Sequence, residues 1–163
     1  MPRLINKLVV TDAGSLMALG RQDLLGLLPM LFQQVHVPDA VVRECLARPE
    51  LPDAQRIKSA LAEGWLMVRD ADPLDIRGLD LGERCAIGVA LDLRAVLLVD
   101  DRAARRHAEA LGLNVLGTLG VLVLAKRRGH IVQVMPVVQA MREDGRFISQ
   151  AAYHAALQAA GEA

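Results

Sequence analysis

Acidic side chains stand directly after two apolar, β-branched runs of the sequence. Asp12 follows residues 8–11, and Asp100 and Asp101 follow residues 96–99. A helical pattern begins immediately after each acid, so each run predicts a strand that delivers its carboxylate to the carboxyl edge of a parallel sheet. If both strands lie in one sheet, the three carboxylates converge at that edge.

Two further acids occupy apolar faces of predicted helices. Glu44 lies in a helix predicted over residues 38–47, and Glu83 lies in a helix predicted over residues 81–94. Each has alanine, valine or isoleucine three or four residues away, which places it on the side of the helix that faces the sheet. An ionised carboxylate buried there must pair with a base, take up a proton or bind a cation, because burying it alone is very costly.

Each acid taken alone also has a purely structural explanation. Asp12, and either Asp100 or Asp101, could cap the helix that follows it. Glu83 lies in a first helical turn, where the helix dipole favours an anion, and Glu44 could reach water at the rim of the core. Capping explains the strand-end aspartates but not two acids on apolar helix faces, so the whole set favours a functional site.

A hard divalent cation is the simplest partner for this set of acids. Arg43, Arg84 and Arg102 are each adjacent in sequence to one of the acids, so on a helix each points about 100° away from it. Mg²⁺ and Mn²⁺ prefer oxygen ligands. Zinc is not favoured, because the four histidines show no ligand spacing and neither cysteine has a nearby partner.

Carboxylates around Mg²⁺ at a sheet edge suit hydrolytic phosphoryl chemistry. The metal lowers the pKa of a bound water and offsets charge on the attacking and leaving oxygens. The sequence contains no G-x-S-x-G elbow, no Walker loop and no G-x-G-x-x-G turn. Motifs of serine hydrolases and of nucleotide-binding folds are therefore absent from it.

The surrounding elements alternate between strand and helix. Strands are predicted over residues 8–11, 35–37, 66–68, 96–99 and 114–116. Helices are predicted over residues 13–20, 22–31, 38–47, 53–63, 81–94, 101–111, 119–128, 132–143 and 149–160, with Pro38 as a first helical residue and Thr118 as an N-cap. This alternation predicts an α/β protein, a three-layer α/β/α sandwich with a mainly parallel central sheet. We expect one domain over residues 1–163, with the helices from about residue 132 packing on the domain or on a partner.

Composition narrows the possible surroundings and partners. The 163 residues are 53% hydrophobic and 23% charged, with a formal net charge of +0, so no whole-molecule field attracts nucleic acid or an anionic membrane. Two cysteines without a C-x-x-C pair, and no secretory segment, favour a reducing cytoplasm. Residues 111–125 are the most apolar stretch, which is shorter than the roughly 18 residues that a membrane span needs.

Five blocks of sequence, in this order, resemble a known family. They are residues 10–16, 37–44, 79–87, 97–105 and 117–122. Together they resemble the PIN domain, the nuclease fold of VapC-type toxins and related ribonucleases, in a prokaryotic branch of predicted nucleic-acid-binding proteins. The resemblance extends from about residue 8 to residue 153.

The resemblance implies an Mg²⁺ (or Mn²⁺) site with acids from distant parts of the chain. The first metal-binding aspartate of the family falls on Asp12, its helix glutamate on Glu44, and its third acid on Glu83. The fourth falls on the pair Asp100 and Asp101, and both are kept because the Thr-x-Asp pattern of many members is missing. Two supporting polar residues are expected near the metal, and they are Ser15 and Thr118.

The resemblance further implies an endoribonuclease that hydrolyses phosphodiesters of single-stranded RNA, in some members the toxin of a toxin–antitoxin pair. An antitoxin protein and a homodimer are the partners it implies. Arg102, Arg105 and Arg106 are candidate phosphate contacts. The neutral net charge and the scarcity of aromatic residues, at 2%, weigh against a broad base-stacking surface.

Two other functions stay open at this stage. One is a catalytically silent PIN-like module that binds nucleic acid or protein, with the apolar residues 134–141 as a dimer or partner surface. The other is a different Mg²⁺-dependent phosphohydrolase, such as a haloacid-dehalogenase-like phosphatase. That class carries Asp-x-Asp after its first strand, and Gly14 at the second position after Asp12 counts against it.

Overall fold

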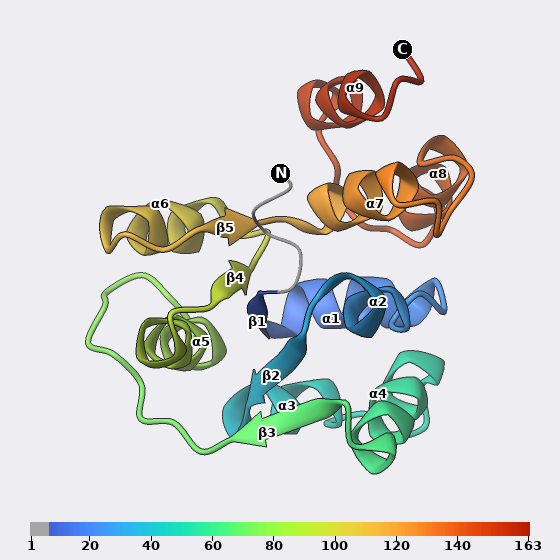
Figure 1. The fold of residues 1–163 in the computed structure, drawn as a ribbon. Helices are drawn as coiled ribbons and strands as arrows, with labels where there is room; N and C mark the ends of the chain where they lie inside the picture. The colour runs from blue at the N-terminus through green and yellow to red at the C-terminus, as the bar shows by residue number, and fades with distance from the viewer. Residues whose placement is uncertain (1–6) are drawn as a thin grey trace.

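Five short strands form one fully parallel sheet in the computed structural model, which describes residues 7–163. The strands are β1 (Leu8–Thr11), β2 (Gln34–Pro38), β3 (Leu66–Arg69), β4 (Val96–Leu98) and β5 (Val115–Leu116). Their order across the sheet is β3-β2-β1-β4-β5 (Figure 1). The chain therefore moves outward from β1 to β3, then returns to the other side of β1. The carboxyl ends of β1 and β4 flank this switch point, where open α/β sheets bind their ligands.

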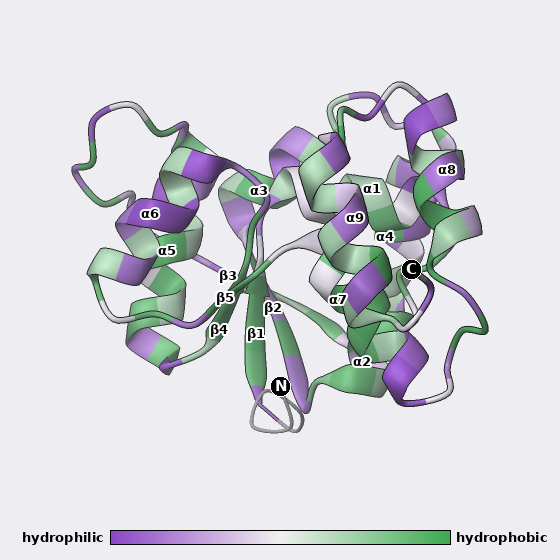
Figure 2. Ribbon diagram, turned by 90° about the horizontal axis from the view of Figure 1, so that it is seen from above, coloured by the Kyte–Doolittle hydropathy of each residue, from purple (hydrophilic) through white to green (hydrophobic). Residues whose placement is uncertain are grey.

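Helices cover both faces of the sheet (Figures 1 and 2). One face carries α5 (Leu81–Leu93) and α6 (Arg102–Ala110). The other face carries α1 (Ala13–Arg21), α2 (Leu27–Leu31), α4 (Pro52–Glu63) and α7 (Thr118–Arg127). The short helix α3 (Asp39–Cys45) contacts both α1 and α5. The predicted three-layer α/β/α fold is confirmed, with a sheet that is parallel throughout.

The strands are apolar on both faces because both faces are covered. Successive residues alternate between the two core clusters: Val9 packs with the α1 layer, and Val10 packs with the α5 layer. On the neighbouring strand β4, Leu98 packs with the α1 layer and Leu97 packs with the α5 layer. The register between β1 and β4 pairs Val10 with Leu97, so side chains of the same face lie side by side on the two strands.

The last two helices, α8 (Met135–Glu143) and α9 (Gln150–Ala159), join the α1 side of the core. Val138 and Met141 of α8, together with Ala156 of α9, are buried in the same cluster as Val9 of β1. Glu162 accepts hydrogen bonds from the backbone N–H groups of Val134 (2.7 Å) and Met135 (3.0 Å). This carboxylate therefore stabilises the start of α8.

The prediction of a continuous helix over residues 22–31 is wrong. Helix α1 ends in a Schellman motif: the N–H of Leu24 bonds the carbonyl of Leu19 at 2.8 Å, and that of Asp23 bonds the carbonyl of Gly20 at 3.1 Å. Asp23 has a positive φ of 56° there, a conformation that aspartate tolerates better than most residues. Only the segment Leu27–Leu31 becomes helical.

Several predicted helix starts also move by one residue, and the start of α8 moves by three, from residue 132 to Met135. Pro38 is the N-cap of α3 rather than its first helical residue. Helix α7 begins with Thr118 itself, because Gly117 takes the N-cap position. Over the part of the chain that the structure describes, none of the helices combines the length and apolar character needed to cross a bilayer.

A matched pair of substitutions tests the packing of α8. Val138 is fully buried, whereas Val132 just before the helix is 87% exposed. We expect Val138→Ala to lower the free energy of unfolding by about 2 kcal/mol, because it removes buried methyl groups and leaves a cavity. Val132→Ala should change it by less than about 0.5 kcal/mol. Urea denaturation of both variants measures the difference, and equal effects would show that α8 does not pack as described.

Candidate functional site

One pocket at the carboxyl edge of the sheet brings together all five acids singled out in the sequence. It has a volume of about 220 Å³. Its lining residues come from the ends of β1 and β4, from α3, from the start of α5 and from the segment between α8 and α9. They are Asp12, Ala13, Gly14, Glu44, Asp80, Glu83, Asp100, Asp101 and Arg146.

Asp12 is the most deeply buried of these acids, with 6% of its surface exposed. It is the N-cap of α1, and its Oδ1 accepts the backbone N–H of Ser15 at 3.0 Å. Burial raises the pKa of Asp12 to about 7, and the nearby charges of Asp100 and Glu83 contribute to this rise against the opposing effect of the Ser15 hydrogen bond. This carboxyl is therefore poised to bind either a proton or a cation near neutral pH.

Glu83 forms a capping box with Asp80 at the start of α5. Its backbone N–H donates to Asp80 Oδ1 at 2.8 Å, and its own Oε1 accepts the N–H of Asp80 at 3.0 Å. Burial raises the pKa of Glu83, opposed by the hydrogen bond from the Asp80 N–H, and neighbouring carboxylates raise it further. Glu83 therefore stabilises the N-terminus of α5, as its position in the first turn predicts, and it also lines the pocket.

The prediction that Glu44 faces the sheet is wrong. Glu44 is solvent-exposed and stands at the rim of the pocket. Helix α3 buries Ala40, Val41 and Cys45. Ala40 and Val41 precede Glu44 by one turn on the same side of the helix, so Glu44 lies at the edge of this buried side and its carboxylate extends past it into water. Even so, partial burial and the charge of Asp80 raise the pKa of this carboxyl.

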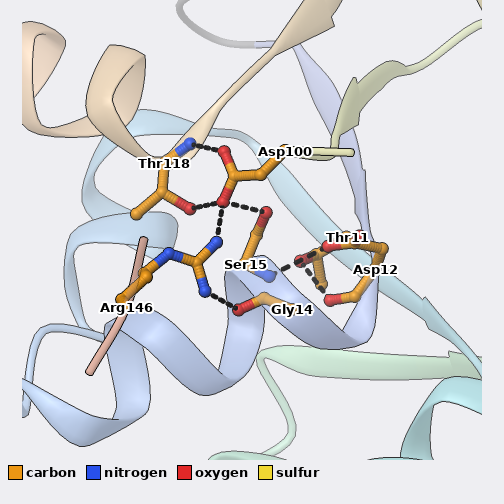
Figure 3. Close-up of polar contacts among 7 residues, drawn as sticks. All are labelled: Thr11, Asp12, Gly14, Ser15, Asp100, Thr118 and Arg146. Carbon is orange, nitrogen blue, oxygen red and sulfur yellow. Dashed lines mark hydrogen bonds and ion pairs between the residues drawn. The ribbon is translucent and has the colours of Figure 1, made fainter. Parts of the chain in front are cut away.

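The two aspartates after β4 have different environments. Asp101 is the N-cap of α6, where its Oδ2 accepts the N–H of Ala104 at 2.9 Å. Asp100 Oδ1 accepts the backbone N–H of Thr118 at 2.7 Å. Asp100 Oδ2 accepts the hydroxyls of Thr118 (2.6 Å) and Ser15 (3.3 Å) and also pairs with the Arg146 guanidinium (Figure 3). Asp100 is thus the centre of a polar network, whereas Asp101 stabilises a helix.

Ser15 and Thr118, the two predicted supporting residues, both contact these acids. Ser15 bridges two of them, because its backbone N–H donates to Asp12 and its hydroxyl donates to Asp100. The predicted N-cap role of Thr118 is wrong: its hydroxyl donates to Asp100 from the first position of α7. Gly117 permits this approach, because a Cβ there would lie 2.9 Å from Asp100 Oδ1.

Arg146 belongs to this pocket although no motif of the sequence points to it. It follows Asp100 by 46 residues and reaches the pocket from the segment between α8 and α9. Its Nη1 donates to the Gly14 carbonyl at 3.3 Å. Two of the arginines adjacent in sequence to the acids have other partners: Arg43 pairs with Asp39 at 3.0 Å, and Arg84 donates to the Leu74 carbonyl at 2.7 Å.

The donor atoms fit a hard divalent ion in kind but do not form a ready ligand shell. Carboxylate oxygens line the pocket, and these are the ligands that Mg²⁺ and Mn²⁺ prefer. Among residues 7–163, however, no group of three or more histidine, cysteine, aspartate or glutamate side chains is arranged to hold a metal ion. A metal would therefore require these side chains to rearrange. The charges of Asp100 and Glu83 act on Asp12, and those of Asp80, Asp101 and Glu44 act on Glu83.

A larger groove of about 770 Å³ adjoins the acid pocket and shares Asp100 and Arg146 with it. The three predicted phosphate-contacting residues, Arg102, Arg105 and Arg106, lie along this groove on α6. Phe147 lines it too and is 89% exposed. Sequence reasoning does not single out Phe147, since one phenylalanine after a predicted helix forms no pattern.

The fold and the pocket describe a parallel α/β protein in which acids gather at the switch point of the sheet. Comparison with known families adds a family to this description. The family model described as PIN domain matches residues 8–162. The chain belongs to the PIN domain family.

A solved structure shows the same fold. A PilT N-terminus domain protein from the hyperthermophilic archaeon Sulfolobus solfataricus P2 is similar, with a TM-score of 0.53 and 23% identity over 72% of this chain and 92% of that one. A domain of a functionally unknown protein from Methanocaldococcus jannaschii DSM 2661 matches with a TM-score of 0.47 and 19% identity, over 68% and 90% of the two chains. No curated protein matches the chain.

The raised pKa of Asp12 predicts a pH-dependent stability when no metal is added. The folded protein holds this proton more tightly than the unfolded chain, whose carboxyl has its ordinary pKa of 3.8. Stability should therefore fall as the pH rises from about 4 to about 7, by an amount on the order of 4 kcal/mol. Asp12→Asn should remove most of this fall, because asparagine stays neutral and still caps α1.

Urea denaturation in EDTA from pH 4 to pH 8 measures this effect. At pH 8 the Asp12→Asn variant should be more stable than the wild type, while at pH 4 the two should agree. Asp92→Asn, at an exposed position of α5, serves as the control and should follow the wild type. A wild-type profile as flat as that of Asp12→Asn would contradict the prediction.

Proposed function

We propose that this protein is a Mg²⁺- or Mn²⁺-dependent endoribonuclease that hydrolyses phosphodiesters of single-stranded RNA. The observation that carries the proposal is the meeting of five acids from distant parts of the chain in one pocket at the sheet edge. PIN domains are generally nucleases, and the chain belongs to that family. The two free cysteines, Cys45 and Cys85, support a reducing, cytoplasmic setting.

In this proposal Asp12, Glu83 and Asp100 would hold the divalent ion, with Asp101 as a further ligand. When bound there, such an ion would lower the pKa of a water and offset charge that develops on the phosphate. Ser15 and Thr118 keep Asp100 in place through their hydroxyls. Glu44 stands at the rim of the pocket with a raised pKa, so it is suited to accept the proton released by the attacking water.

The groove beside the pocket is the proposed path of the RNA strand. Arg102, Arg105 and Arg106 form no ion pair within the described part of the chain, so their charges are available to phosphates. Phe147 offers an exposed ring on which one base can stack. Because the groove shares Asp100 with the acid pocket, a strand bound there passes the acids.

A toxin role is the narrower form of this proposal. The resemblance to VapC-type toxins supports it, and it includes an antitoxin protein as partner and a homodimer as the assembly. Residues 134–141 do not support a dimer surface, because Val134, Val138 and Met141 are buried in the core. The neighbouring reading frame tests the role: a small overlapping antitoxin-like gene would support it.

A catalytically silent binding module is the second candidate. It is favoured by the lack of a preformed metal-ligand group among residues 7–163 and by the ion pair between Arg146 and Asp100. In such a module the groove would still bind nucleic acid, but Mg²⁺ and Mn²⁺ would change neither stability nor RNA integrity.

Metal linkage and cleavage assays separate the two candidates. With Mn²⁺ or Mg²⁺ the melting temperature should rise, because an ion that binds only the folded protein stabilises it. A generic single-stranded RNA should be cut only when the metal is present. Glu83→Gln should slow cleavage by about 100-fold or more, since it removes a metal ligand, and should weaken the thermal response.

Glu143→Gln is the matched control, because Glu143 is exposed at the end of α8 and lies outside the pocket. It should behave as the wild type does. Equal cleavage by wild type and Glu83→Gln would indicate a contaminating nuclease or a wrong site. The absence of any thermal response to both metals would favour the silent module.

Salt dependence tests the groove. Removing one phosphate-binding side chain should reduce the slope of log K against log salt concentration by about 0.7 for a single strand. The slope is negative, and we expect the double variant Arg102→Ala, Arg106→Ala to reduce its magnitude by about 1.4, twice the single effect. Fluorescence anisotropy with labelled RNA in EDTA measures this change. Arg128→Ala, at an exposed position after α7, should leave the slope unchanged. An unchanged slope in the double variant would place the RNA outside the groove.

Stacking on Phe147 is tested in the same assay. Phe147→Ala should weaken binding by about 1–3 kcal/mol, the range found for removal of one base–aromatic stack. Phe147→Tyr keeps the ring and should retain the affinity. If the alanine and tyrosine variants bind RNA equally, the ring has no part in binding.

A further inference from the structure

The guanidinium of Arg146 occupies a position in the acid pocket where a cation is needed. Its Nη2 pairs with Asp100 Oδ2, and its Nη1 donates to the Gly14 carbonyl at 3.3 Å (Figure 3). The two charged side chains are partly buried, with 25% and 30% of their surfaces exposed. The ion pair is therefore less screened by water than a surface pair.

The segment between α8 and α9 holds Arg146 in this position. Helix α8 ends in a Schellman motif, in which Gly145 has a φ of +92° and the N–H of Arg146 bonds the Met141 carbonyl at 3.0 Å. On the other side, Arg142 donates to the Ile148 carbonyl at 3.0 Å and lies 4.3 Å from the centre of the Tyr153 ring. The backbone on both sides of Arg146 is thus fixed by packing and hydrogen bonds.

Asp100 Oδ2 has no capacity left for a metal ion in this arrangement. It accepts from Thr118 Oγ1, Ser15 Oγ and Arg146 Nη2, which is more than the two lone pairs of one carboxylate oxygen. A divalent ion on this oxygen would lie next to the Arg146 guanidinium, so the two positive charges compete for Asp100. Arg146 also lines the basic groove, so a place outside the acid pocket is within its reach.

We propose that Arg146 is a built-in competitor of the divalent ion: the metal binds the acid pocket only when the guanidinium leaves Asp100. This inference rests on the proposed metal-dependent function and adds a regulatory step to it. The state with Arg146 on Asp100 is the resting state, and its population lowers the apparent affinity for metal. In the metal-loaded state Arg146 turns toward the groove, where an RNA phosphate can accept its hydrogen bonds.

Mn²⁺ titration by isothermal calorimetry tests this competition without any RNA. Arg146→Ala and Arg146→Met, which both remove the charge, should bind Mn²⁺ about 5- to 150-fold more tightly than the wild type, the usual range of a coupling between two ligands. Arg146→Lys keeps a cation, so its affinity should lie between that of the wild type and those of the neutral variants. Arg48→Ala breaks an exposed ion pair with Glu50 outside the pocket and should bind as the wild type does.

Chemical rescue gives a second measurement. Guanidinium chloride at non-denaturing concentration should weaken Mn²⁺ binding to Arg146→Ala, while sodium chloride at the same ionic strength should do so less. In the wild-type protein, saturating Mg²⁺ should shift the Nε–H signal of Arg146 in a nitrogen-correlated NMR spectrum. This last readout needs no variant, so an unchanged signal overturns the competition even if substitutions at Arg146 prevent folding.

The outcomes are distinguishable. Equal or weaker Mn²⁺ binding by Arg146→Ala and Arg146→Met, or an unchanged Arg146 signal at saturating Mg²⁺, would overturn the competition and leave the metal-dependent function standing. If no form of the protein binds Mn²⁺, both the competition and the proposed function are overturned.

Discussion

Electrostatic repulsion among carboxylates is the constraint on which this structure depends. The fold places Asp12 after β1 and Asp100 after β4, on neighbouring strands of a parallel sheet. Two further acids, Glu83 and Glu44, approach from α5 and α3. Like charges in one pocket disfavour one another's ionised forms, and they contribute to the raised pKa of Asp12. A pocket of this kind is stable only if protons, hydrogen-bond donors or cations offset the repulsion.

Helix N-termini provide much of that compensation. Asp12 caps α1, Asp101 caps α6, and Asp80 with Glu83 caps α5. The first N–H of α7, from Thr118, donates to Asp100. The positive ends of these helix dipoles therefore converge on the acids. Structural and functional explanations of the acids are thus not exclusive, because the same carboxylate can cap a helix and line the pocket.

The sequence predicts the fold well because its signals are local. Apolar runs that end on an acid and are followed at once by a helix identify β1 and β4 and the edge where Asp12 and Asp100 lie. The end of α1 escapes prediction because a Schellman motif with Asp23 in a left-handed conformation lacks the usual glycine signal. The exposure of Glu44 is not predicted either, since Glu44 lies at the edge of the buried side of the short helix α3, where tertiary packing decides how far a side chain is covered.

Other parts of the site depend on contacts between distant residues, which no local pattern encodes. Asp100 and Asp101 are neighbours in sequence, and only the positions of Thr118 and Ser15 distinguish the networked acid from the helix cap. Arg146 is separated from Gly14 by 132 residues. This long separation also has a consequence for biosynthesis. A ribosome must extrude the chain past residue 146 before Asp12, Asp100 and Arg146 can meet, so a nascent chain that ends before this point carries no complete pocket.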